Sequence, residues 1–337
     1  MRSTMQDVAR ECGLSMMTVS RVLRGQGYVS AATRERVVEA AKRLDYELNV
    51  LAQNFARRRS GLVGIAAPFA GLIGSHYFGE IIRGFQRAFE DSEWNLVLFD
   101  ILSPSFDDGK KLAGLFRTRK VDGLLVVAPG AKDKFLDTFS DLQFPLVVVG
   151  KKVTNAKVCC VSCDDRHGIE LACAHLHALG HRKIAFVGGP LGFSVAQERE
   201  RGYQEFSRAK KLPIPPEFLQ RGDYSMLSGR RAGEALLNGK RRPTAILAAN
   251  DMMAFGVMES ARELGVAVPD QLSVAGFDDL PTAAERFPSL TTVHQPVVEM
   301  AEQGASLLRS WMENDHTPKR KIVVPVSLVT RESTAKR

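Results

Sequence analysis

Apolar residues in the first 23 positions recur at helical spacing in two short groups separated by Gly13. Because positions three and four apart share one face of an α-helix, each group predicts one amphipathic helix. The residues expected to pack these helices against a third one are Val8, Ala9, Leu14, Val19, Val22 and Leu23. The stretch 5–23 therefore predicts two short helices joined by a tight turn, which is a helix-turn-helix.

Cap residues support these two helices. Thr4 and Asp7 can form a capping pair for the first helix, and Ser15 can cap the second. Gly13 stands where a left-handed turn residue is needed. The outward-facing residues of the second helix are Ser15, Met16, Met17, Thr18, Ser20 and Arg21. Such a face suits base edges in the major groove, whereas the alternative is an ordinary helical hairpin with a solvated polar face.

A third helix is predicted from a Ser30 cap to about Leu44, with Val37, Val38 and Ala41 also at helical spacing. After Ser60 the pattern changes to short aliphatic runs alternating with helical periodicity. Buried parallel strands are predicted at 62–66, 96–99, 123–127, 145–149 and 159–162, and in a second set at 184–187, 217–222, 245–248, 272–275 and 290–293. The fold class is therefore α/β, with a small all-α head followed by two doubly wound parallel-sheet subdomains and a ligand cleft between them.

Positive charge is concentrated near the N-terminus. Residues 1–60 hold eleven Lys or Arg and six Asp or Glu, so 11 − 6 = +5 of the chain's net +8 lies there. Arg57, Arg58 and Arg59 form a dense cluster beside the predicted head. Such a cluster is often only a solvated linker, but next to a helix-turn-helix it favours contacts with DNA phosphates.

The composition fits a protein of the cytoplasm. The 337 residues exceed one typical domain, and 45% hydrophobic residues can form a sizeable core. We expect no membrane association, because there is no run of eighteen apolar residues and no signal-peptide core at the start. Five cysteines form no even framework, so we expect reduced thiols and no disulfide.

Cysteines and histidines crowd residues 159–181, but their spacing is not that of a zinc ribbon or zinc finger. Cys159 and Cys160 fall on one predicted strand and should point to opposite faces, while Cys173 and His177 fall on another element. We therefore predict no metal site and no cofactor.

The sequence resembles the LacI family of bacterial transcriptional regulators. In the head the resemblance is carried by Asp7-Val8-Ala9, Gly13-Leu14-Ser15, residues 18–23, Val29-Ser30, residues 33–37, Leu44-Asp45-Tyr46, Asn49 and Ala52. It continues through motifs such as 121–123, 179–185, 250–251 and 276–279, and so covers nearly the whole chain. Two departures stand out: Leu48 replaces the usual proline, and Phe55 replaces the leucine that the family inserts in the minor groove.

The resemblance implies a DNA-binding domain over residues 1–48, a hinge helix and linker over 49–60, and an effector-binding and dimerisation core over 61–337. The implied DNA contacts are Ser15, Met16, Met17, Thr18, Ser20, Arg21, Tyr28, Asn49, Ala52, Gln53, Phe55 and Ala56. Phe55 would act as a wedge at the operator centre, on a helix too short to be stable alone. The alternative is that Phe55 packs on the core beside Leu62.

By motif position, the implied effector contacts are Tyr77, Phe78, Arg199, Tyr224, Asn250 and Asp278. Arg donates through a planar fork, Asp accepts from paired hydroxyls, and aromatic rings cover the apolar faces of a sugar, so carbohydrates fit best. Lys151 follows a predicted strand, which leaves an acidic or phosphorylated sugar open. The alternative is that Arg199 and Asp278 are surface residues or a structural ion pair.

Two other classes of function compete with a regulator. An enzyme is disfavoured because the chain has no nucleophile elbow, phosphate-binding loop, zinc-protease motif or dinucleotide fingerprint. A sugar-binding protein of the periplasm would share the cleft, but it would need an export signal and no helix-turn-helix. The sequence thus predicts a homodimeric, ligand-responsive repressor of carbohydrate-utilisation genes on a palindromic operator. It leaves open the effector, its role as inducer or corepressor, the operator sequence, activation instead of repression, and a tetramer.

Overall fold

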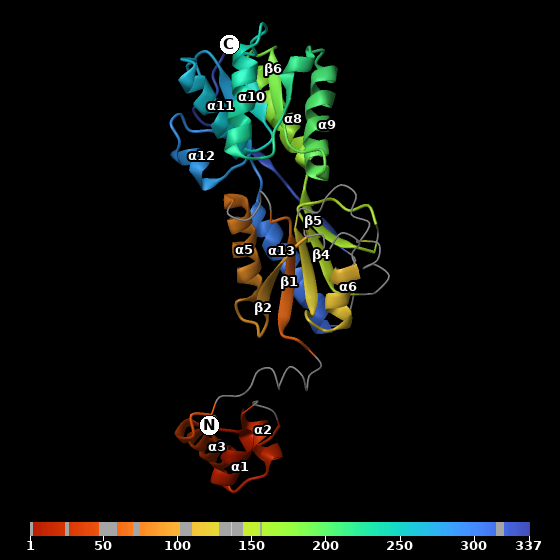
Figure 1. The fold of residues 1–337 in the computed structure, drawn as a ribbon, viewed down its shortest axis with the longest axis vertical. Coiled ribbons are helices and arrows are strands. Elements are labelled where there is room, and N and C mark those ends of the chain that lie inside the picture. The colour runs from red at the N-terminus through yellow and green to blue at the C-terminus, as the bar shows by residue number, and fades with distance from the viewer. Residues whose placement is uncertain are drawn as a thin grey trace. The chain divides into compact units, whose positions relative to one another are not determined.

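The computed structural model describes residues 3–23, 27–46, 59–69, 75–101, 110–127, 136, 144–155, 157–314 and 320–337. The chain divides into two compact units, Met1–Ser60 and Gly61–Arg337, which we call the head and the core (Figure 1). None of the helices in the described ranges is long and apolar enough to span a bilayer.

The head contains three helices, α1 (Met5–Cys12), α2 (Met16–Leu23) and α3 (Ala31–Arg43). The predicted caps are confirmed. Thr4 and Asp7 form a reciprocal capping box at α1, and Gly13 ends it at a φ of 60° in the left-handed region. The Ser15 side chain accepts a hydrogen bond from the backbone N–H of Thr18 at the start of α2. The Ser30 side chain accepts one from the backbone N–H of Thr33 at the start of α3. Local hydrogen bonds therefore set the helix boundaries of the head.

The small core of the head is formed by all three helices. Its buried residues are Val8, Ala9, Cys12, Val19, Val22, Val37, Ala40 and Ala41. The prediction that Val38 shares this face is wrong, because its side chain is 40% exposed and Ala40 is buried instead. Position 38 is turned about 100° from position 37 on the helix, whereas positions 40 and 41 return to the face of Val37.

The core holds two sheets, as predicted, but each has six strands where the sequence predicted five. The first has the order β11-β5-β4-β3-β1-β2 and the second the order β12-β10-β9-β8-β6-β7. The first is built from β1 (Leu62–Ala67), β2 (Asn95–Asp100), β3 (Gly123–Val127), β4 (Leu146–Val149), β5 (Cys159–Cys163) and β11 (Lys321–Val324). The second is built from β6 (Ile184–Gly188), β7 (Leu219–Arg221), β8 (Ala245–Ala248), β9 (Ser273–Asp278), β10 (Thr291–His294) and β12 (Ser327–Val329).

The sequence reading did not include the edge strands β11 and β12. Strand β11 extends the first sheet in parallel to β5, whereas β12 pairs with β10 in antiparallel orientation. The other strand pairs are parallel, so the second sheet departs from a purely parallel arrangement only at this edge. Both strands are short and partly exposed, as is common at the edges of sheets.

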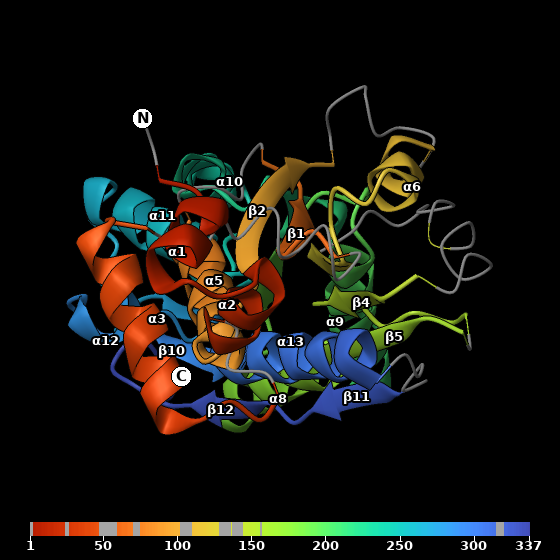
Figure 2. The ribbon, with the colours of Figure 1, turned by 90° about the horizontal axis from the view of Figure 1, so that it is seen from below.

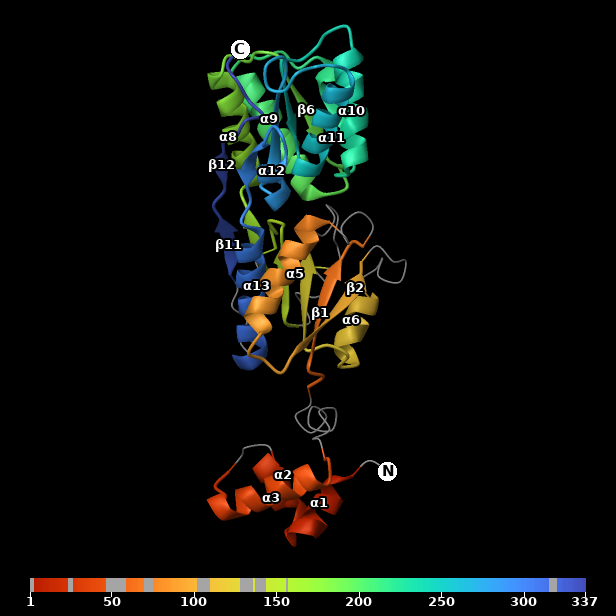
Figure 3. The same cartoon turned by 90° about the vertical axis from the view of Figure 1, so that its left-hand side faces the viewer.

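Helices cover both faces of each sheet (Figure 3). On the first sheet, α5 (His76–Phe89) and α13 (Val297–Asn314) share one hydrophobic cluster, and α6 (Lys110–Arg117) contributes to the cluster on the other face. Figure 2 shows α13 alongside this sheet from a second direction, where it packs on β3, β4 and β5. The second sheet carries α8 (Asp165–Ala178), α9 (Ser194–Ala209), α10 (Met226–Asn238), α11 (Asp251–Glu263), the short α12 (Pro281–Glu285) and a 3-10 turn (Pro216–Phe218).

The chain passes between the two sheets three times. It crosses from β5 to α8, returns from β10 to α13, and crosses again from β11 to β12. The two subdomains therefore share three connecting segments, one of which follows β5 and another β10. These connections bring residues that are far apart in the sequence to the region between the sheets.

The cysteine-rich region is part of the packed interior. Cys159 and Cys160 belong to the two clusters on opposite faces of the first sheet, as the strand alternation predicts. Cys173 lies in the interior of the other subdomain.

Candidate functional site

The exposed face of α2 carries the predicted DNA-contacting side chains. Val19 and Val22 are buried against the other helices, whereas Met16, Met17 and Arg21 are exposed on the opposite side. The remaining predicted residues of the helix, Thr18 and Ser20, are half-buried, and Ser15 is exposed. Tyr28, between α2 and α3, is fully exposed.

The predicted hinge contacts belong to the segment after α3. Asn49, Ala52, Gln53, Phe55 and Ala56 lie outside the described residues. The roles assigned to them, including the Phe55 wedge, stay predictions from the sequence.

A cavity of about 140 Å³ lies in the core where strands of both sheets end. From the first subdomain it is lined by Pro68, which follows β1, by Gly150, which follows β4, and by residues at the start of α5. The second subdomain contributes Phe193, Val195, Arg199, Asp223, Tyr224, Asn250, Met252, Asp278, Leu280 and Gln295. The carboxyl ends of parallel strands are where open α/β sheets bind ligands, so the cavity lies where this fold would bind a ligand.

Five of the six residues predicted from the sequence line this cavity. They are Tyr77, Arg199, Tyr224, Asn250 and Asp278. The sixth, Phe78, belongs to the interior of the first subdomain, where it packs with Ile81 and Phe85. Its backbone N–H is capped by Ser75 at the start of α5, and the next residues on that face are buried.

Arg199 is held at the cavity wall by four groups of the core. Its Nε donates to Oδ1 of Asp165 at 2.8 Å, and its Nη2 donates to Oε1 of Gln295 at 3.2 Å. Its Nη1 donates to the backbone carbonyl of Ala249 and lies 3.5 Å from Oδ1 of Asp278. Arg199 therefore lines the cavity and forms a buried structural ion pair, and its contact with an effector stays a prediction.

Two buried carboxyl groups thus share one guanidinium. Burial opposes the charge of Arg199, but the carboxylates of Asp165 and Asp278 outweigh it and raise the pKa of the guanidinium. Burial raises the pKa of Asp278 to about 7, although Arg199 acts in the other direction. Burial also raises the pKa of Asp165. One cation does not compensate both carboxylates, and a proton on Asp278 relieves the remaining negative charge.

Tyr224 presents an unusual polar group. Its hydroxyl is buried and has no hydrogen-bond partner among the described residues. Burial raises the pKa of this phenol, and its electrostatic neighbours are Arg199, Asp165 and Asp278. The ring lies so close to Gly189 that a Cβ there would meet ring and hydroxyl atoms within 2.6 Å. Gly189 is therefore needed for the observed position of the ring.

Asn250 is engaged at both ends of its amide. Its Oδ1 accepts the backbone N–H of Met253 and caps α11, while its Nδ2 donates to the backbone carbonyl of Tyr224 at 3.0 Å. One N–H of the amide is left for other partners. Asn250 thus positions the Tyr224 backbone at the cavity.

The sequence reading missed Asp165, Gln295 and Asp223. Asp165 follows β5 and Gln295 follows β10, so both stand at crossings between the two sheets. Their signal was a polar residue within three positions of the end of a predicted strand. Lys151 is not among the residues that line the cavity, although its neighbour Gly150 is.

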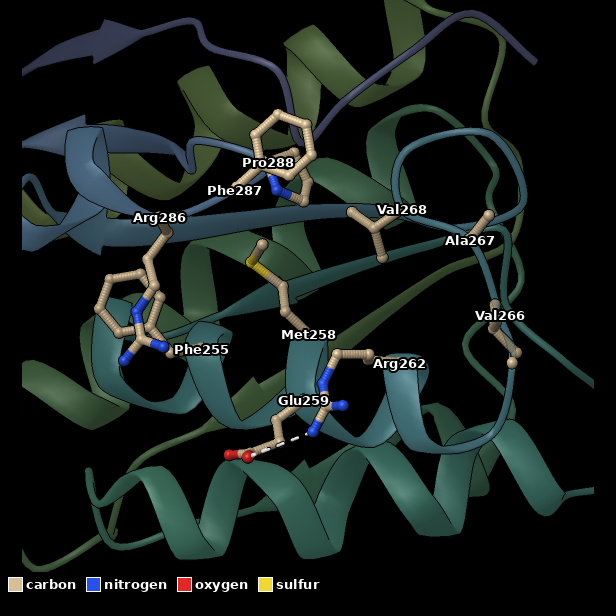
Figure 4. Close-up of a pocket in the computed structure, with 11 residues that line it drawn as sticks. Phe255, Met258, Glu259, Arg262, Val266, Ala267, Val268, Arg286, Phe287 and Pro288 are labelled. Atoms are coloured by element: carbon tan, nitrogen blue, oxygen red, sulfur yellow. Dashed lines mark ion pairs between the residues drawn. The ribbon is translucent and has the colours of Figure 1, made fainter.

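A second concave region lies on the surface of the second subdomain. It has a volume of about 410 Å³ and is formed by the α11 side chains and the segment around a cis proline, Pro288 (Figure 4). Phe287 is 95% exposed, and the guanidinium of Arg286 lies 4.8 Å from the centre of the Phe255 ring.

Comparisons with known proteins match both units of the chain. Residues 4–49 match the family described as bacterial regulatory proteins, lacI family, and residues 173–334 match the periplasmic binding protein-like domain. The probable HTH-type transcriptional repressor ExuR of Bacillus subtilis is 31% identical over 332 residues, which are 98% of each chain. The HTH-type transcriptional repressor PurR of Photorhabdus laumondii is 30% identical over 98% of this chain and 96% of its own.

Solved structures agree with this similarity. The lac repressor dimer bound to operator and an anti-inducer matches with a TM-score of 0.88 at 29% identity, over 99% of this chain and 100% of the other. The complex of the transcriptional regulator CelR with cellobiose matches with a TM-score of 0.73 at 29% identity, over 98% and 100%.

Proposed function

Because this chain belongs to the LacI family of bacterial regulatory proteins, and is thus a DNA-binding transcriptional regulator, we propose that it is a homodimeric repressor controlled by a neutral carbohydrate. The observation that carries the proposal is the combination, in one chain, of an exposed α2 face and a polar cavity between two α/β subdomains. The two curated relatives reported above are described as transcriptional repressors, and the two solved structures hold cellobiose in one case and an anti-inducer in the other.

Recognition of a palindromic operator follows from the small size of the head. One helix-turn-helix reads only a few base pairs, so two heads related by a dimer axis are needed for useful specificity. The net +5 of residues 1–60 supplies phosphate contacts. A protein that binds operators acts where the chromosome lies, so we place it in the cytoplasm.

The concave surface around Phe287 is the face that we assign to the dimer. Phe287 is 95% exposed and lies beside Pro288, close to the contact between Arg286 and Phe255. Aromatic residues and arginine are enriched at the centres of protein interfaces, so the composition of this surface is typical of such a centre. In Figure 4 the Phe287 ring projects away from the α11 side chains. A second copy that covers this ring would remove apolar area from water.

A neutral effector is supported by the charges of the cavity wall. Arg199 is the only Lys or Arg among the described lining residues, and it is already paired with Asp165 and Asp278. Asp223 adds a further carboxyl group. An acidic or phosphorylated sugar would meet the carboxylate of Asp223 and would find no unpaired Lys or Arg in the described lining, whereas sugar hydroxyls could donate to the carboxyl oxygens. Tyr77, Phe193 and Tyr224 supply aromatic surface for the sugar ring.

Selection of bound sequences from a random duplex library, followed by gel retardation, tests operator binding. We expect one palindromic consensus, and affinity that falls steeply as salt rises because counterions are released. Arg21→Ala should reduce affinity for that consensus by about 1–3 kcal/mol and affinity for random DNA much less, since a base contact discriminates and a phosphate contact does not. Absence of any retarded complex at low salt would contradict the proposal.

A further inference from the structure

The first turn of α2 presents two adjacent methionines to solvent. At 100° per residue, Met16, Ser20, Met17 and Arg21 occupy one continuous face, opposite buried Val19 and Val22. The Met16 side chain is 52% exposed and that of Met17 is 66% exposed. Neither belongs to the hydrophobic cluster that holds the head together, although Met5 packs against it.

The hydroxyl groups at the start of α2, those of Ser15 and Thr18, are already bonded to each other. The Ser15 hydroxyl accepts the backbone N–H of Thr18, and the two hydroxyls lie 2.9 Å apart in a mutual hydrogen bond. Thr18 is also half-buried. At the N-terminal turn of the helix, where recognition helices contact base edges, the projecting side chains are therefore those of Met16 and Met17.

We propose that Met16 and Met17 read thymine methyl groups in the major groove, so that each operator half-site carries A·T pairs opposite the first turn of α2. The proposal rests on the DNA-binding function proposed above and names the chemistry of its sequence preference. A Met side chain has no donor and only a weak acceptor, so it pairs poorly with the polar edges of guanine, adenine or cytosine. The thymine C5-methyl group is the one apolar feature in the major groove.

A polar base edge opposite these side chains would lose water without gaining a partner. The methionines would then disfavour G·C pairs at these positions as well as favour thymine. Their flexible thioether chains can adjust to two neighbouring methyl groups on either strand.

The test replaces thymine by deoxyuridine, which pairs identically but lacks the methyl group. Half-sites selected by the full-length protein are resynthesised with one such replacement at a time, and the affinity of each duplex is measured. We expect a loss of about fourfold for each methyl group that a methionine covers, which corresponds to the burial of one such group. Met17→Ala should remove the loss at one position, and Met16→Ala at the other.

Val38→Ala is the matched control, because Val38 is an exposed apolar residue of the same head on α3. This variant should discriminate thymine from deoxyuridine as the parent does. Retained binding of each methionine variant to random DNA at low salt shows that the head is folded. Selected half-sites that the parent binds equally with thymine or deoxyuridine at every position would overturn the proposal. Failure to select any sequence would instead contradict DNA binding itself.

Discussion

The candidate functional residues of the head are exposed to water, whereas those of the core are buried. In the head, Met16, Met17 and Arg21 project from a small hydrophobic cluster to which they do not belong. In the core, Arg199 and Asp278 are buried and bonded to their neighbours. Function and stability should therefore separate in the head, whereas in the core the same side chains determine both.

The physical reason lies in desolvation. An exposed side chain makes its contacts mainly after DNA has bound, so its removal changes affinity alone. A buried charge has lost its water, and removal of its partner leaves that charge uncompensated. Substitutions in the two regions should thus differ in their effect on the free energy of unfolding.

Arg199→Ala is expected to have the largest effect. It leaves the carboxyl groups of Asp165 and Asp278 without their cation, and should lower the free energy of unfolding of the core by about 3–5 kcal/mol. It should also abolish the response to the effector, while operator affinity of the folded protein stays nearly intact. Urea unfolding and operator titration measure the two effects.

Arg201→Ala is the control on the same helix, since its pair with Glu198 is exposed. Its loss should cost less than about 1 kcal/mol. Similar costs for the two variants would contradict the contrast between buried and exposed charges.

The free energy of unfolding should depend on pH because the buried carboxyl group of Asp278 titrates. The pKa of Asp278 is about 7 in the folded protein against 3.8 as its ordinary value, so the folded state holds the proton more tightly. This contribution to stability is present below pH 4 and is lost as the pH rises to 7, up to about 4 kcal/mol in all.

Asp278→Asn removes the titrating group, so its stability should fall less than that of the parent between pH 5 and pH 8. Burial raises the pKa of Asp165 in the same direction, and some slope should remain. Parallel curves for the parent and the variant, obtained by thermal unfolding across this range, would show that Asp278 does not titrate there.

Phe287→Glu tests whether the exposed surface of the core behaves as the head does. Phe287 is 95% exposed, so the substitution should leave the free energy of monomer unfolding almost unchanged. At the centre of an interface it should cost about 2 kcal/mol or more of association, roughly thirtyfold in the dissociation constant. Sedimentation at several concentrations measures this constant.

Leu191→Glu, at another exposed apolar residue, is the control. Equal association of the two variants would exclude this face from the dimer.

Tyr224→Phe should have the smallest effect on the free energy of unfolding, and we expect this substitution to stabilise the core. Its buried hydroxyl has no partner in the described structure, so its removal should raise the stability of the ligand-free core by about 1 kcal/mol. In Tyr203→Phe, the lost hydroxyl donates to the backbone carbonyl of Ile184 at 2.8 Å, and stability should fall by a similar amount. Destabilisation by both variants would mean that the Tyr224 hydroxyl is satisfied in solution.

Local interactions explain what the sequence made predictable. Caps such as those of Thr4 and Ser30 depend on neighbours three residues away, so the helix boundaries of the head could be derived directly. Most of the ten predicted strands also have strong hydrophobic runs. Strand β12 is exposed and takes its place through pairing with β10, more than thirty residues earlier, which no local pattern reveals.

The same limit applies to the effector cleft. Tyr77, Arg199, Tyr224, Asn250 and Asp278 were found by motif position and not by their chemistry alone. Asp165 and Gln295 meet Arg199 only because the chain crosses between the sheets after β5 and after β10. Their role as its partners depends on this topology and not on the local sequence.

The central claim, that a ligand in the core cleft controls operator binding by the head, has one direct test. A panel of neutral sugars is screened for the one that most raises the melting temperature of the full-length protein. Operator affinity is then measured with and without saturating amounts of that sugar. We predict a change of about 5–150-fold, the usual range for coupling between two sites. A sugar that binds and stabilises the core while operator affinity stays constant would contradict the account.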